Sequence, residues 1–208
     1  MKVKFINGER WNGKGKECDF GKLIFEGEYL NGKRNGKGKE YNNNGDLIFK
    51  GEYLNGQIWN GIGKIYNDFG TLLFEGEYLN GKRNGKGKEY NDKSDLKFEG
   101  EYLNGQIWNG KGKEYNDFGT LLFEGEYLNG QRNGKGKEYN LINGTIYEGE
   151  YINGVKNGKA KEYYYNGNLK FEGEYLNGKR NGKGKEYNIN GELKFEGEYL
   201  KGKRKPIQ

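Results

Sequence analysis

Residues 25–38 have the sequence FEGEYLNGKRNGKG, and close copies of this stretch recur along the whole chain of 208 residues. The glycine of the Gly-Glu-Tyr core marks the period, which is 24 or 25 residues. The marker glycines are Gly27, Gly51, Gly76, Gly100, Gly125, Gly149, Gly173 and Gly197. A fixed period in this range is typical of stacked repeats, in which each unit buries its apolar face only against its neighbours.

Each repeat contains the pattern of one β-hairpin. Phe25, Gly27 and Tyr29 alternate with polar residues, as expected for a strand with one aromatic face. The Asn-Gly pair at residues 31–32 favours the positive-φ geometry of a tight hairpin turn. Residues 36–41 then form a short return strand. No segment shows helical periodicity, and glycine recurs too often for a helix interior.

Glycine is the main feature of the return strand. We expect that Gly36 and Gly38 occur there because the absence of a side chain lets neighbouring aromatic rings lie over the backbone. Residues 42–46 form a second turn, after which the next repeat begins. The sequence therefore predicts an all-β fold, an elongated single-layer antiparallel sheet of stacked β-hairpin repeats. Residues 1–208 form one repeat array of about eight hairpin units, with partial units at both ends.

Charged residues alternate on the other face of the predicted sheet. Glu26 and Glu28 could pair across the strands with Lys37 and Lys39. Such a cross-strand pair contributes about 0.2–1 kcal/mol, and less when it is exposed. We interpret this alternation mainly as a solvated face.

The composition argues against catalysis. The chain has no histidine and a single cysteine, Cys18, so a serine or cysteine nucleophile would lack an imidazole base and a Cys/His metal set cannot form. Paired carboxylates recur in nearly every unit. Asp-Phe-Gly at residues 68–70 and 117–119 reads as a turn, and residues 105–112 lack the hydroxyl of a phosphate-binding loop. We expect no enzyme activity, no cofactor, no metal site and no small-molecule substrate.

The motif in residues 25–38 resembles the MORN repeat (membrane occupation and recognition nexus). The shared pattern is aromatic-x-Gly-x-aromatic, followed by x-x-Gly and Gly-x-Gly. Residues 164–173 are similar to the bacterial-type variant of this repeat. The resemblance covers the whole chain. It implies scaffolding, self-association, or the placement of a partner near membranes.

A second, longer period is marked by tryptophan. Trp11, Trp59 and Trp108 occur in every second repeat, each with an extra residue near the hairpin turn. One interpretation is that tryptophan closes a longer turn. The alternative is a periodic aromatic ridge for a partner, because tryptophan is enriched at binding hot spots. We take these three residues as candidate partner-binding residues.

Basic residues beside the hairpin turns are candidate contacts to an anionic surface. The chain carries a net charge of +6, but 30 acidic residues are interleaved with 36 basic ones, which disfavours nucleic acid as a partner. We expect the basic residues to project from one edge, where they could be simply solvated or could meet acidic lipid. These candidates are Lys33, Arg34, Lys82, Arg83, Arg132, Lys179 and Arg180.

These observations predict a non-enzymatic repeat scaffold for protein–protein interaction or self-association along an extended β-sheet. The alternative is peripheral binding to acidic phospholipid membranes through the basic hairpin turns. No apolar run approaches the roughly 18 residues of a membrane span, and the N-terminal sequence lacks a secretory signal. We therefore expect a cytoplasmic location, with attachment to a membrane surface under the alternative.

Overall fold

The computed structural model describes residues 4–6 and 9–206, with side chains from residue 12 onward. These residues form 18 β-strands, and none of their elements is a helix that could cross a membrane. The all-β prediction is confirmed. The chain divides into two compact units, residues 1–106 and 107–208, which are described separately.

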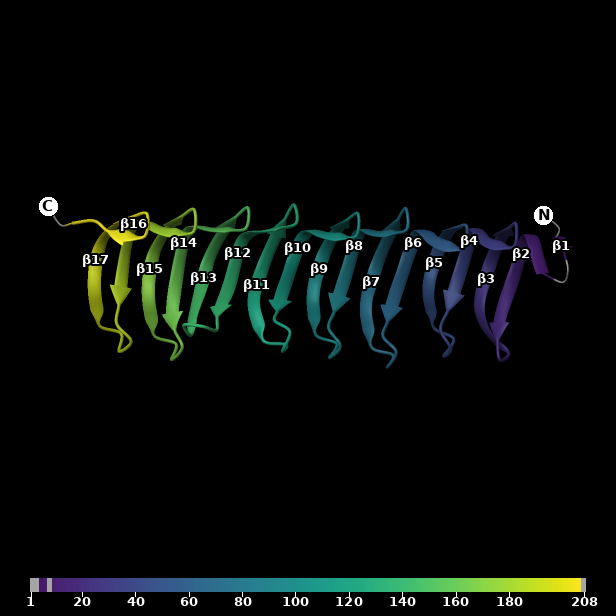
Figure 1. The fold of residues 1–208 in the computed structure, drawn as a ribbon, viewed down its shortest axis with the longest axis horizontal. Coiled ribbons are helices and arrows are strands. Elements are labelled where there is room, and N and C mark those ends of the chain that lie inside the picture. Colours follow the sequence, from purple (N-terminus) through teal and green to yellow (C-terminus); the bar gives the residue numbers. More distant parts are fainter. Residues whose placement is uncertain (1–3, 7–8, 207–208) are drawn as a thin grey trace. The chain divides into compact units, whose positions relative to one another are not determined.

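The strands of each unit follow one another in chain order and are joined by turns (Figure 1). In the first unit they are β1 Lys4–Ile6, β2 Glu9–Asp19, β3 Lys22–Leu30, β4 Lys33–Tyr41, β5 Leu47–Leu54, β6 Gln57–Tyr66, β7 Leu72–Leu79, β8 Lys82–Tyr90 and β9 Leu96–Leu103. In the second unit they are β10 Gln106–Tyr115, β11 Leu121–Leu128, β12 Gln131–Asn140, β13 Thr145–Ile152, β14 Val155–Tyr164, β15 Leu169–Leu176, β16 Lys179–Tyr187, β17 Leu193–Leu200 and β18 Lys203–Arg204.

All pairing is antiparallel, between consecutive strands, in an open sheet. The register aligns the motif glycines in rows across the strands. Gly27 of β3 faces Gly38 of β4, which in turn faces Gly51 of β5. The same register places Phe25 opposite Glu40. The same register recurs in both units, as between β7 and β8 and between β11 and β12, whereas between β5 and β6 Phe49 faces Gly63.

Aromatic rings form the buried core of each unit. Six of the motif phenylalanines are almost completely buried, and Phe25 is 0% exposed. Its ring packs edge-to-face on Tyr29 of its own strand, with centroids 5.6 Å apart, and on Tyr53 of the next repeat, 5.1 Å apart. Such edge-to-face pairs add to the large apolar area that each ring buries. The rings therefore link successive repeats without a second layer of secondary structure.

Glycine is required at residues 36 and 38 of the return strand for two different reasons. A Cβ on Gly38 would lie 2.6 Å from the Phe25 ring, so the prediction that an aromatic ring covers Gly38 is confirmed. Gly36 instead has φ +90°, and a Cβ there would meet the Glu28 carboxylate. Glu28 Oε2 accepts a hydrogen bond from the backbone N–H of Lys37 at 3.0 Å. Glu28 thus stabilises a bulge in β4 instead of pairing with a lysine side chain.

The opposite face of the sheet carries the expected cross-strand charges. Lys39 Nζ lies 3.3 Å from Glu26, and the Tyr41 hydroxyl donates to the same carboxylate at 3.0 Å. In the second unit, the Tyr139 hydroxyl donates to Glu124 at 2.9 Å. Desolvation, together with this carboxylate, raises the pKa of Tyr139 to about 12. These pairs join the two strands of one hairpin.

The turns lie on two opposite sides of each sheet. We call the side with the turns inside each repeat the hairpin side, and the side with the turns that join repeats the linker side. On the hairpin side, Asn31 and Gly32 have φ of +50° and +74°, as a type I′ turn requires. The next turn is attached to the previous repeat, because Gly56 N–H donates to the Arg34 carbonyl at 2.8 Å. A ladder of backbone hydrogen bonds therefore runs along this side.

Candidate interaction surfaces

The arginines of the Lys-Arg pairs lie over the aromatic core and do not project from the sheet edge. The Arg34 guanidinium lies 4.2 Å from the centre of the Phe25 ring. It donates to Glu17 of the previous repeat and to Glu40 of its own hairpin, at 2.7 and 2.8 Å. The Arg34 side chain is only 19% exposed. Arg83, Arg132 and Arg180 stack on phenylalanine in the same way.

The electrostatics of these pairs favour the charged state of both partners. Burial by itself would lower the pKa of Arg34, but hydrogen bonds to Glu17 and Glu40 outweigh it and raise the pKa. Hydrogen bonds from Arg132 hold the pKa of Glu114 below its usual range, against the effect of burial. The arginines are therefore engaged in joining repeats. Their predicted contact with an anionic surface stays a prediction, for which the lysines are better placed.

The lysines beside the hairpin turns are exposed. Lys33, Lys82 and Lys179 are the first residues of β4, β8 and β16, directly after an Asn-Gly turn. Sequence reasoning grouped each lysine with the arginine that follows it. The structure separates them, because consecutive residues of a strand point to opposite faces.

The extra residue of the tryptophan repeat in the first unit is accommodated within the strand, in a different bulge from that of β4, and does not lengthen the turn. In β6, Ile58 pairs with Tyr53 and Asn60 with Glu52, so Trp59 is the additional residue between them. The Trp59 ring is half-buried and lies 3.8 Å from the Cβ position of Gly81, in the next hairpin turn.

Trp108 in the second unit occupies the same kind of site. Its ring lies 4.0 Å from the Cβ position of Gly130, which is again in the next hairpin turn. Trp11 lies in β2, but its side chain is outside the described residues. Packing against a neighbouring turn thus accounts for Trp59 and Trp108 in part, and their partner-binding role stays a prediction.

Apolar side chains at the tips of the linker turns are the candidates that sequence reasoning missed. Phe20, Phe69 and Phe118 are 98%, 94% and 93% exposed, and Ile142 is 99% exposed. The three phenylalanines belong to Asp-Phe-Gly segments. Residues 68–70 and 117–119 were predicted only as turns, and residues 19–21 were not singled out. The sequence does contain a signal for these candidates, because an aromatic residue stands at a turn position where other linker turns carry asparagine or lysine.

Phe20 is also unusual in its backbone. It has φ +44° in the two-residue turn between β2 and β3. A bulky residue is disfavoured in this left-handed region, whereas asparagine tolerates it. Nearly all the described hairpin turns place asparagine there, as at Asn31 and Asn55. Because outliers of this kind concentrate at functional sites, Phe20 suggests a role outside the fold.

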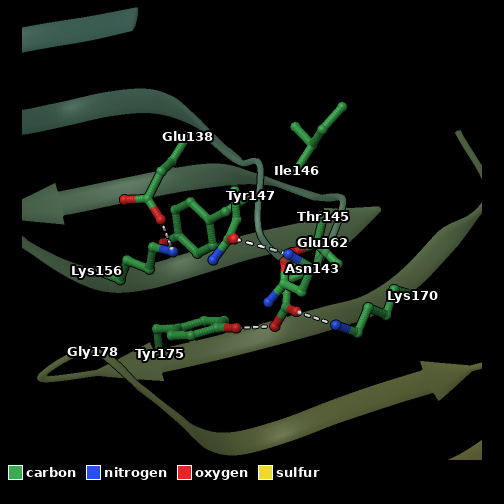
Figure 2. Close-up of a pocket in the computed structure, with 11 residues that line it drawn as sticks. Glu138, Asn143, Thr145, Ile146, Tyr147, Lys156, Glu162, Lys170, Tyr175 and Gly178 are labelled. Atoms are coloured by element: carbon green, nitrogen blue, oxygen red, sulfur yellow. Dashed lines mark hydrogen bonds and ion pairs between the residues drawn. The ribbon is translucent and has the colours of Figure 1, made fainter. Parts of the chain in front are cut away.

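The second unit has a shallow hollow of about 180 Å³ on its aromatic face (Figure 2). Here Lys156 stands in the place of the usual arginine. Its ammonium lies 4.3 Å from the centre of the Tyr147 ring and 2.6 Å from Glu138. Glu162 pairs with Lys170 at 3.7 Å on the other side of the hollow.

The charges that line this hollow are already matched. Burial would raise the pKa of Glu162, but hydrogen bonds from Arg180 and Tyr175 outweigh it, and the pKa is lowered. Among the described residues, no buried side-chain polar atom lacks a hydrogen-bond partner. Nothing in the hollow therefore points to a ligand.

A family model for the MORN repeat matches five segments of the chain, residues 25–47, 74–94, 123–140, 147–169 and 171–192. The matches cover just over half of the 208 residues. The chain belongs to the MORN-repeat family. No curated protein matches it by sequence. Residues 48–73 and 95–122, between the matched segments, contain Trp59 and Trp108.

Proposed function

We propose that this MORN-repeat chain is a non-enzymatic scaffold that binds a protein partner, or further copies of itself, along its repeated sheet. The observation that carries the proposal is the row of exposed apolar tips on the linker side. In the second unit, three consecutive linker turns present Phe118, Ile142 and Tyr165, which are 93%, 99% and 76% exposed. None of these side chains belongs to the buried core.

The spacing of the tips suits a protein interface. Consecutive linker turns are separated by two strands, or about 10 Å, because neighbouring strands lie about 4.8 Å apart. A repeated sheet holds such tips at regular positions. Aromatic residues dominate binding energy at many interfaces, and contiguous exposed apolar groups mark interaction sites. The linker tips of the second unit therefore support a binding surface better than any hollow in the described residues.

The test is capture of partners by the intact chain, compared with a variant in which Phe118, Ile142 and Tyr165 are changed to serine. We expect the wild type to retain specific proteins at moderate salt, and the triple variant to lose them. The matched control changes the polar tips Asn43, Asn44 and Asn190 to serine and should bind as the wild type does. Equal capture by the triple variant and the wild type would contradict this assignment of the surface.

A second arm of the experiment addresses the tryptophans. Changing Trp59 and Trp108 to alanine should weaken capture if their half-exposed rings contribute to the interface. Because both rings pack on the next hairpin turn, the melting temperature of this variant must be measured in parallel. A loss of capture without a loss of stability would support a direct contact.

Binding to acidic phospholipid is the second candidate function. It is supported by the exposed Lys33, Lys82 and Lys179 on the hairpin side. A basic residue near an anionic membrane contributes about 1 kcal/mol, and salt screens this contribution. Binding to phosphatidylserine vesicles that is lost when these three lysines become glutamine would favour this candidate. The arginines must be kept in this test, because their loss would destabilise the array.

A further inference from the structure

The two sides of the first unit carry opposite charge. On the linker side, acidic residues outnumber basic ones. The acidic residues are Asp19, Asp46, Asp68, Asp92 and Asp95, and the basic residues are Lys22 and Lys93, all of them exposed. In the described hairpin turns from residue 30 onward, the charged residues are Lys33 and Lys82, and no carboxylate lies in or directly beside a turn. The unit is therefore polarised from one side to the other.

Both sides also present apolar groups. On the linker side these are Phe20 and Phe69, which are 98% and 94% exposed. On the hairpin side, one leucine precedes each Asn-Gly turn. These residues are Leu30, Leu54, Leu79 and Leu103, with exposed fractions between 39% and 48%. Each side thus combines apolar side chains with a net charge, which is negative on the linker side and positive on the hairpin side.

We propose that the linker side of the first unit docks onto the hairpin side of the first unit of a second copy of this chain. In this contact, Phe20 and Phe69 insert between the leucine-bearing turns of the second copy. Asp19 and Asp68 lie beside the two phenylalanines in sequence and meet Lys33 and Lys82 of that copy. The inference rests on the proposed scaffold function and specifies one of its partners.

The period of the two rows favours a second copy over an unrelated protein. Leucines recur once per repeat, or about every 10 Å, whereas Phe20 and Phe69 are two repeats apart, or about 19 Å. The phenylalanines therefore match every second gap between hairpin turns. Another partner would need the same spacing together with basic residues at the same interval. The second copy has both because it has the same repeat.

The backbone of Phe20 supports a role for its side chain outside the fold. Its φ of +44° disfavours a bulky residue, and asparagine would relieve the strain. Phe69 reaches the same exposure from a different turn, in which its N–H donates to Asn67 Oδ1 at 3.1 Å. Two different backbone geometries thus present the same side chain to solvent.

The contact is heterologous, because a linker side meets a hairpin side. A dimer formed in this way retains one free linker side and one free hairpin side, so the association continues beyond a dimer. The resulting assembly depends on protein concentration. High salt weakens its charged part, because exposed ion pairs are screened.

The experiment is sedimentation velocity on the full chain at several concentrations, with two charge-reversal variants. One changes Asp19 and Asp68 to lysine, and the other changes Lys33 and Lys82 to glutamate. We expect the wild type to show a weight-average mass that rises with concentration. Each variant alone should stay monomeric, because its two sides then carry the same sign of charge.

A mixture of the two variants in equal amounts should associate again. Both sides of the aspartate-to-lysine variant are positive, and both sides of the lysine-to-glutamate variant are negative. Each side therefore finds a side of opposite charge only on the other variant. Restored association identifies the two sides as partners, which loss of association alone would not do.

Controls separate the docking from net charge and from folding. Changing Lys37 and Lys86 to glutamate alters net charge as much as changing Lys33 and Lys82, but at exposed mid-strand positions, and should leave association intact. Changing Phe20 and Phe69 to serine should abolish association with all charges kept. Circular dichroism and melting curves establish that each variant is folded.

The proposal is overturned if the wild type stays monomeric over the whole concentration range. It is also overturned if either charge-reversal variant alone associates as the wild type does, or if their mixture stays monomeric. Capture of a different protein through residues 118–165 is measured independently. A failure of self-association therefore leaves the test of the scaffold function unaffected.

Discussion

Phe25 and its counterparts require glycine at specific positions, because each ring lies over glycines on two adjacent strands. A Cβ on Gly27 or on Gly38 would lie 2.6 Å from the Phe25 ring. The ring in turn supports the guanidinium of Arg34 at 4.2 Å. Glycine, phenylalanine and arginine thus form one layered contact, which recurs along each unit.

Gly38→Val should destabilise the first unit by about 1–3 kcal/mol, the usual scale for overpacking a filled site. The added side chain would displace the Phe25 ring, and with it the contacts to Tyr53. Denaturant unfolding measures the loss. Lys37→Val is the matched control, because this exposed neighbour points to the other face. Unchanged unfolding of the Gly38→Val variant would contradict the packing account.

Arg180→Gln should cost about 1–3 kcal/mol, because it removes charged hydrogen bonds and a cation–π contact from a partly buried site. Arg180 is 17% exposed, lies 4.1 Å from the centre of the Phe171 ring and donates to Glu162 at 2.9 Å. Lys179→Gln makes the same charge change one residue earlier, at an exposed position, and should change stability by less than about 0.5 kcal/mol. Equal unfolding midpoints for the two variants would contradict the structural role of the arginine.

At the scale of the elements, the turns determine how one hairpin meets the next. On the hairpin side, Asn55 N–H donates to Asn35 Oδ1 at 3.2 Å, so a side chain of one repeat holds the turn of the following one. On the linker side, Asn42 Oδ1 accepts hydrogen bonds from the N–H groups of Asn44 and Asp46 at 3.0 and 2.9 Å. These asparagines close the turns locally and leave the tip residue free to vary.

Phe20→Asn should stabilise the first unit by about 0.5–1 kcal/mol, because asparagine tolerates the left-handed backbone that phenylalanine does not. The control is Phe69→Asn, since Phe69 is not among the described residues with positive φ. Thermal melts at low protein concentration, where copies do not associate, compare the two. A gain of similar size in both variants, or in neither, would show that strain at residue 20 is not the cause.

At the scale of the whole molecule, the ion pairs that border the buried rings make part of the stability depend on pH. Each unit has its own run of buried aromatic rings, which is bordered by arginine–glutamate pairs. The pKa values of Glu114 and Glu162 are lowered in the folded chain by hydrogen bonds from arginine and tyrosine. Folding is therefore coupled to the ionisation of these carboxylates.

The sign of this coupling predicts acid unfolding. A carboxylate with a lowered pKa in the folded state contributes its full stability above its unfolded pKa of about 4.3 and loses it as the pH falls further. The melting temperature should thus be flat near neutral pH and should fall steadily below about pH 4.5. Glu162→Gln should melt lower at pH 7 and should show a smaller drop on acidification. A drop as large as that of the wild type would exclude a contribution from Glu162.

The period, the hairpin, the tight turns and the aromatic face were all determined by the sequence alone. The reason is that they depend on residues only a few positions apart. Alternation along residues 23–30 defines a strand and its apolar face. The Asn-Gly pair at residues 31–32 defines the turn, because few other residues adopt positive φ without strain. The coverage of Gly38 by the ring of Phe25, on the neighbouring strand, could also be predicted, because the hairpin brings the aromatic face of one strand beside the glycines of the next.

Only the tertiary structure decided where the charged and exposed side chains go. Arg34 meets Glu17, which lies 17 residues earlier in the chain, so its position depends on the register between repeats. The bulge at Trp59 appears only when β6 is aligned with β5, because one extra residue can be absorbed by either a turn or a strand. The sequence places Phe69 in a turn, but the exposure of its side chain follows only from the way that turn lifts it away from the sheet. Local sequence patterns therefore do not reveal the candidate site, because whether a side chain is buried or exposed depends on how the repeats assemble.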